Sequence, residues 1–84
     1  MNIADVVGLF AAGLGTIATA PQVIKVYRTK NTQDLSLGTF GMVTGTLFLW
    51  FIYGLMVHSL PITIGNALGF SFNLYIVIMK IKLG

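Results

Sequence analysis

"TAPQVIKVYRTKNTQDLS", residues 19–36, separates two long apolar runs of this 84-residue sequence. One run, residues 6–24, leads into the stretch and the other, residues 35–79, leads out of it. Neither run contains Asp, Glu, Lys or Arg. The stretch holds Pro21 and Gln22 inside an otherwise helical hydrophobic pattern, and its residues 25–30 include three of the five basic residues of the sequence. The stretch therefore marks where one apolar helix ends and a polar connection begins.

The composition indicates a protein that lies in lipid. Hydrophobic residues make up 56% of the chain and charged residues only 8%, whereas about 25% of the residues of an average soluble domain are charged. A soluble chain this short needs many polar residues to cover its large surface. There is no cysteine, so disulfides and cysteine-based metal or redox sites are excluded.

The lengths of the apolar runs set the number of membrane crossings. A helix needs about 20 residues to cross a hydrocarbon core of about 30 Å, so the run of 45 residues is too long for one crossing. It breaks naturally at "HSLP", residues 58–61. Pro61 fits the first turn of a helix, where a missing N–H costs nothing, and Ser59 can cap that helix.

We therefore predict an all-α integral membrane protein, a three-helix transmembrane bundle in a single domain. The domain comprises residues 1–84, with helices at about 3–27, 36–57 and 61–80. We expect Asp34 and Ser36 to cap the second helix, where the positive end of the helix dipole stabilises a carboxylate.

The basic residues predict the orientation of these helices. Three crossings place Lys25, Arg28, Lys30, Lys80 and Lys82 on one side of the membrane. By the positive-inside rule that side is cytoplasmic, so the N-terminus is expected outside and the C-terminus in the cytoplasm. The charges sit at the ends of apolar runs, which argues against nucleic acid as a partner. A signal peptide is disfavoured because the first run lacks a basic leading segment and is too long.

Polar groups at one depth of the membrane predict a binding site. Trp50 is expected roughly 5 Å and Asn66 roughly 7 Å to the outside of the mid-plane, on antiparallel helices. Asn73 follows two turns below Asn66, nearly on its face. An indole stacks on the apolar face of a ring, and a carboxamide donates and accepts hydrogen bonds, which suits a neutral polyhydroxylated ligand. The alternative for each residue alone is structural, as packing or as an interhelical hydrogen bond.

Helix-bending and helix-packing residues have two interpretations each. Pro21 removes one backbone hydrogen bond and clashes with the carbonyl of residue 17, which gives either a static kink or a hinge for an inner gate. Glycines at GxxxG spacing permit close helix approach, within one chain or between two chains. These pairs are Gly41 with Gly45 and Gly65 with Gly69.

The apolar spans lack the groups that other mechanisms require. His58 is the only ionisable residue in the second run and is expected to be a solvated residue of the outer turn. Proton relays and voltage sensors depend on charged groups within the membrane. No phosphate-binding loop, metal cluster or nucleophile–base pair is visible. We therefore predict that the protein is not an enzyme and uses no cofactor and no metal.

Three stretches together identify a family resemblance. "PQVIKVYRTKNTQDLS" (residues 21–36), "LWFIYG" (49–54) and "LPITIGN" (60–66) resemble the bacterial SemiSWEET sugar transporters, half-size relatives of the SWEETs within the PQ-loop group. The resemblance covers essentially the whole chain. It implies a half-transporter that forms a parallel homodimer with its two-fold axis along the membrane normal. It also implies facilitative (uniport) transport of neutral sugars by alternating access, in the bacterial inner (plasma) membrane.

The resemblance also implies roles for single residues. Trp50 and Asn66 match the substrate-binding residues, Tyr53 an outer-gate residue, and Pro21 with Gln22 the inner hinge. Asn73 is a possible further residue of the pocket.

The sequence departs from the family at the outer gate. Some relatives have an opposite-charge pair just after "YG", and this chain has none there. Two alternatives to sugar transport stay open: transport of another small neutral solute, or a non-transporting or pore-forming small membrane protein. The size of the sugar, one ring or two, is open as well.

Overall fold

The computed structural model describes residues 2–84 as three helices joined by two short connections. The helices are α1 (Ile3–Thr29), α2 (Leu37–Met56) and α3 (Leu60–Leu83). Each is long and apolar enough to cross a membrane by its length and composition. The molecule is 44 Å long, close to the roughly 40–45 Å of a bilayer with its headgroups. The helix ends lie within three residues of the predicted ends.

Serine side chains begin the second and third helices. Ser36 accepts a hydrogen bond of 3.2 Å from the backbone N–H of Thr39, and Ser59 accepts one of 3.4 Å from that of Ile62. Both caps agree with the sequence prediction. The prediction that Asp34 also caps α2 was wrong, because Ser36 holds the N-cap position and Asp34 lies two residues earlier, in the turn.

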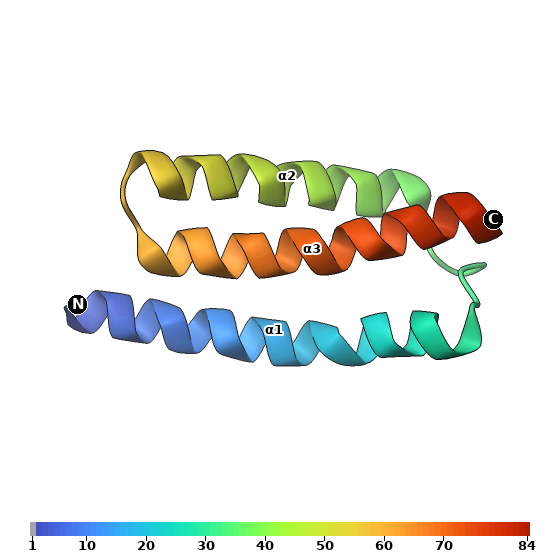
Figure 1. Ribbon diagram of the computed structural model, residues 1–84, viewed down its shortest axis with the longest axis horizontal. Helices are drawn as coiled ribbons and strands as arrows, with labels where there is room; N and C mark the ends of the chain where they lie inside the picture. Colours follow the sequence, from blue (N-terminus) through green and yellow to red (C-terminus); the bar gives the residue numbers. More distant parts are fainter. Residues whose placement is uncertain (1) are drawn as a thin grey trace.

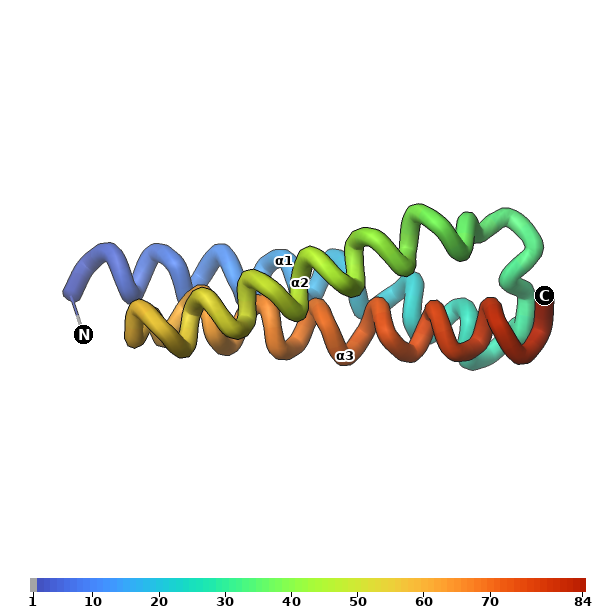
Figure 2. The backbone as a smooth tube through the Cα atoms, turned by 90° about the horizontal axis from the view of Figure 1, so that it is seen from above, coloured from blue at the N-terminus to red at the C-terminus, as the bar shows by residue number. Residues whose placement is uncertain are grey.

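The three helices form a shallow layer with α3 in the middle (Figure 1). Both outer helices contact α3, whereas within residues 2–84 no Cα atoms of α1 and α2 approach within 8 Å. The layer measures 22 Å across and 13 Å through. Figure 2 shows α2 tilted away from α3 toward the end where α2 begins. A layer of this kind cannot enclose a cavity by itself.

Small residues let α1 pack closely along α3. A methyl group placed on Gly8 would stand 2.7 Å from Cβ of Pro61, and one placed on Gly65 would stand 3.0 Å from Cβ of Ala12. These contacts advance by four residues on each helix, so the two helices run in parallel with a constant offset. Close backbone approach of this kind strengthens dispersion contacts in lipid, where no hydrophobic effect separates helix from tail.

The two GxxxG pairs behave differently. Gly65 and Gly69 face neighbouring helices, whereas a methyl group on Gly41 or Gly45 would meet no atom of residues 2–84 within 4 Å. Within one chain, therefore, the expectation of close packing holds for the pair on α3 only. The face of α2 that carries Gly41 and Gly45 is open.

The most deeply buried side chains lie at the end of the molecule that carries the basic residues. Val26 and Ile76 are the buried apolar residues there, and Thr32, in the connection between α1 and α2, is only 1% exposed. The Lys80 ammonium donates a 2.8 Å hydrogen bond to the Thr32 carbonyl oxygen, and the Thr32 hydroxyl donates a 3.1 Å bond to the carbonyl oxygen of Gly84. The connection is thereby tied to the last turns of α3.

Candidate functional site

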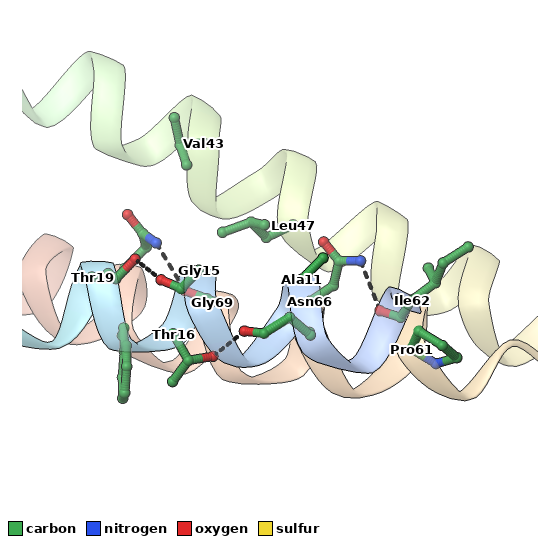
Figure 3. A pocket seen from close by; sticks show the side chains of 15 residues that line it. Ala11, Gly15, Thr16, Thr19, Val43, Leu47, Pro61, Ile62, Asn66 and Gly69 are labelled. Atoms are coloured by element: carbon green, nitrogen blue, oxygen red, sulfur yellow. Dashed lines mark hydrogen bonds between the residues drawn. The ribbon is translucent and has the colours of Figure 1, made fainter. Parts of the chain in front are cut away.

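A groove of about 540 Å³ runs along one face of the helix layer (Figure 3). Residues of α3 form its floor, and α1 and α2 contribute its two walls. Among residues 2–84, those that line it include no charged side chain. The groove is therefore a neutral path along the molecular axis, open on the side away from α3.

The wall from α1 consists of small side chains. Its residues recur every three or four positions, so they share one face of the helix. They are Gly8, Ala11, Ala12, Gly15, Thr16 and Thr19. The sequence analysis did not single out this face, although its signal, small residues at helical spacing, is visible in the sequence. The lack of large side chains on α1 is what leaves room for the groove.

Four polar side chains line the groove, and each donates one hydrogen bond to its own helix. The amides of Asn66 and Asn73 donate to the carbonyl oxygens of residues 62 and 69, over 2.7 and 2.9 Å. The hydroxyls of Thr16 and Thr19 donate to the carbonyl oxygens of residues 12 and 15, each over 2.8 Å. The backbone bonds of Asn66 and Thr19 are drawn in Figure 3. Each amide retains its carbonyl oxygen and one N–H, and each hydroxyl retains its acceptor capacity.

Two contacts fix the register of the antiparallel helices α2 and α3. A methyl group on Gly54 would stand 2.8 Å from the backbone nitrogen of Thr63, and one on Gly69 would stand 3.4 Å from the side chain of Leu47. From the contact of Leu47 with Gly69 to the contact of Gly54 with Thr63, α2 advances by seven residues and α3, which runs the other way, goes back by six. Positions near the middle of the two segments, 50 and 66, therefore lie at one level.

Trp50 thus lies level with Asn66, at the edge of the groove. It shares a helix face with Val43 and Leu47, which line the groove from α2. Trp50 itself is not among the lining residues of the single chain, and it is 49% exposed. Its indole meets the ring of Tyr53 edge to face, with ring centroids 5.3 Å apart. The two aromatic side chains form one unit beside the half of the groove nearer the turn between α2 and α3.

The residues of the expected hinge follow the last groove-lining residue of α1, Thr19. Pro21 lies within α1 without ending it. Gln22 lines a second cleft, of about 210 Å³, with residues that include Val26, Phe40 and Ile76. The structure therefore places Asn66 and Asn73 in the groove and Trp50 and Tyr53 beside it. Of the two expected hinge residues, Gln22 lines the second cleft, and Pro21 precedes it within α1.

The outer turn contains His58. This residue has a positive φ of 57° and an exposed side chain, as expected for a solvated turn residue. Within residues 2–84, no group of three or more His, Cys, Asp or Glu side chains is arranged to hold a metal ion.

Comparison with known proteins identifies close sequence relatives. The family model for the PQ loop repeat matches residues 3–63. The sugar transporter SemiSWEET of Bradyrhizobium diazoefficiens is 40% identical over 78 residues, which cover 93% of this chain and 91% of that protein. The sugar transporter SemiSWEET of Leptospira biflexa is 35% identical over 80 residues, covering 95% and 94% of the two chains.

Solved structures share the fold over nearly the whole chain. A crystal structure of a bacterial homologue of SWEET transporters superposes with a TM-score of 0.89 at 31% identity, covering 99% of this chain and all of that one. A crystal structure of SemiSWEET in the inward-open conformation gives 0.90 at 30% identity, covering 96% and 94%. The same arrangement of three helices therefore occurs in crystal structures of other proteins.

Proposed function

Since this chain belongs to the PQ-loop repeat family, among its SemiSWEET members, we propose that it is a facilitative (uniport) transporter of neutral sugars. It works by alternating access as a parallel homodimer. Its relatives in Bradyrhizobium and Leptospira are named sugar transporters. The protein is a multi-pass membrane protein with three apolar helices.

The observation that carries this proposal is the chemistry of the groove. Its polar groups are amides and hydroxyls, its lining residues carry no charge, and the only tryptophan of the chain lies level with Asn66. Amides and hydroxyls both donate hydrogen bonds to sugar hydroxyls and accept them, and they place no charge in the site. An indole packs on the C–H face of a sugar ring. Trp50 and Asn66 are the proposed substrate-binding residues, and Asn73 extends the pocket.

A homodimer explains why the groove is open on one side. A second copy, related by a two-fold axis along the membrane normal, brings two grooves face to face and closes a path that one layer cannot enclose. The exposed half of the Trp50 indole then faces the path. Both copies keep their basic ends on one side of the membrane.

Alternating access needs one gate on each side of the pocket. Tyr53 is the proposed outer gate, because its ring packs edge to face on Trp50 and a gate movement there changes the pocket directly. Pro21 and Gln22 are the proposed inner hinge. Proline leaves one carbonyl of α1 without its helical partner, which lowers the cost of bending the helix at this point.

The basic residues support the proposed orientation. They are found in the last turns of α1, in the connection that follows and in the last turns of α3, all at the same end of the molecule. The positive-inside rule makes this end cytoplasmic and places the N-terminus outside. The proposed location is the bacterial inner (plasma) membrane.

Counterflow in proteoliposomes tests the function. Vesicles preloaded with unlabelled glucose or sucrose are expected to accumulate the labelled sugar transiently, with no ion gradient applied, and L-glucose serves as the stereochemical control. Neutral amino acids added as competitors test the other solute class. Accumulation that requires a proton or sodium gradient, or unselective leakage of a trapped dye, would contradict the proposal.

Substitutions in the same assay test the pocket. Trp50→Ala and Asn66→Ala are expected to abolish counterflow while the dimer still assembles. Leu49→Ala and Ser71→Ala are the matched controls. Leu49 is an exposed neighbour of Trp50, and Ser71 is an exposed residue whose hydroxyl donates a 2.9 Å bond to the carbonyl oxygen of residue 67. Full counterflow in both pocket variants would reject the assignment.

A further inference from the structure

We propose that Thr19 and Asn73 form a second sugar-binding level, on the cytoplasmic side of Trp50 and Asn66. This inference rests on the proposed function, since it concerns the same path. Its ligand is the set of ring hydroxyls of a neutral sugar. The level holds the sugar after the inner gate opens and before release.

Thr19 and Asn73 lie at one height, Thr19 on the α1 wall of the groove and Asn73 on its floor. The contact of Ala12 with Gly65 and the parallel course of α1 and α3 place Thr19 level with residue 72, next to Asn73. Both side chains line the groove. Asn73 lies seven residues beyond Asn66, about 10 Å further along the axis. A single sugar ring cannot span both levels at once.

The two side chains at this level keep hydrogen-bonding groups that are free to bind a ligand. The Asn73 amide and the Thr19 hydroxyl each donate one bond to their own backbone, over 2.9 and 2.8 Å. These bonds hold the side chains in place and leave an amide N–H, an amide carbonyl and a hydroxyl oxygen to face the groove. A two-fold axis doubles this set. Val43 supplies an apolar surface on the wall opposite α1.

This level lies at the end of the groove that is next to the second cleft. The inner cleft contains Gln22 and Ile76, each three residues beyond a member of the level on the same helix. Spacing of three residues keeps each pair on one helix face, so the cleft continues the groove toward the cytoplasmic end. Pro21 lies two residues after Thr19. Bending at Pro21 would open the cleft while the residues before it stay in place.

Transport from each side of the membrane separates this role from a structural one. Thr19→Val replaces the hydroxyl with a methyl group, and Asn73→Leu replaces the amide with an apolar group of similar size. In vesicles that expose the cytoplasmic face, each variant is expected to raise the half-saturating glucose concentration roughly tenfold, as the loss of one or two hydrogen bonds implies. In vesicles that expose the outer face, the rise is expected to stay below about twofold.

Control variants make the test decisive. Ser71→Ala removes a hydroxyl with the same backbone bond outside the groove and is expected to change neither value. Thr19→Ser keeps the hydroxyl, so its half-saturating glucose concentration on the cytoplasmic face is expected to equal that of the unmodified protein. If Asn73→Leu does not assemble, Thr19→Val alone decides. The second level would be overturned if the half-saturating glucose concentration on the cytoplasmic face were unchanged, or if it rose equally on both faces. Absence of sugar transport in the unmodified protein would instead overturn the proposed function.

Discussion

The ammonium group of Lys80 lies 2.8 Å from the carbonyl oxygen of Thr32, across 48 residues of sequence. This hydrogen bond joins the connection after α1 to the last turn of α3. Thr32 is 1% exposed, so its carbonyl has little access to water. The contact therefore holds the connection after α1 against the end of α3, beyond the proposed hinge.

Lys80→Met is expected to destabilise the protein by about 1–3 kcal/mol, because it leaves a buried carbonyl without its charged donor. Lys82→Met is the matched control. Lys82 lies two residues further along α3 with an exposed side chain and is expected to change stability by less than about 0.5 kcal/mol. Unfolding in detergent with increasing SDS measures both. Equal stability of the two variants would contradict the anchoring role of Lys80.

Gly54→Ala is expected to destabilise the contact of α2 with α3. The added methyl group would stand 2.8 Å from the backbone nitrogen of Thr63, and neither helix can yield without moving. Overpacking of this kind costs about 1–3 kcal/mol. Gly45→Ala, on the same helix but without a neighbour within 4 Å among residues 2–84, is the control, and its better helix propensity favours the fold. Equal thermal stability of the two variants would show that the packing at Gly54 is looser than described.

Local signals in the sequence predicted the spans and the level of the site. Run length, the break before Pro61 and the serine caps are properties of neighbouring residues, and rise per residue placed Trp50 and Asn66 at one depth. The structure bears out this shared level. The proposed roles of these residues stay predictions.

Contacts between distant residues account for what the sequence did not predict. The central place of α3 depends on small residues that meet across helices, such as Gly65 and Ala12, and no local pattern specifies which helices pair. For the same reason the groove-lining face of α1 was missed. Gly41 and Gly45 have the same spacing as Gly65 and Gly69, but a methyl group on either would meet no atom of residues 2–84 within 4 Å. Spacing alone therefore does not identify a packing partner.

Pro21→Ala tests whether Pro21 acts as a hinge in α1. Alanine restores the missing backbone hydrogen bond and removes the steric clash, so α1 becomes straighter and stiffer. The expected result is slower counterflow, by several-fold, with an unchanged affinity for sugar in equilibrium binding. Counterflow at the normal rate would make the proline a static feature of the helix.

Chemical crosslinking tests the parallel homodimer. All lysines lie at one end of the molecule, in the last turns of α1 and α3 and the connection after α1. In a parallel dimer the lysines of the two copies share one side of the membrane, so a short amine-reactive crosslinker is expected to give a dimer and no larger product. A ladder of higher oligomers would favour a pore-forming assembly instead.

The fluorescence of Trp50 tests the central claim most directly, because it is the only tryptophan of the chain. Titration of the purified dimer with a transported sugar is expected to change the emission saturably, with a midpoint that matches half-saturation of transport. In Asn66→Ala the midpoint is expected to rise at least roughly tenfold. Emission that stays constant at sugar concentrations that saturate transport would show that the indole does not line the sugar path and would contradict the account.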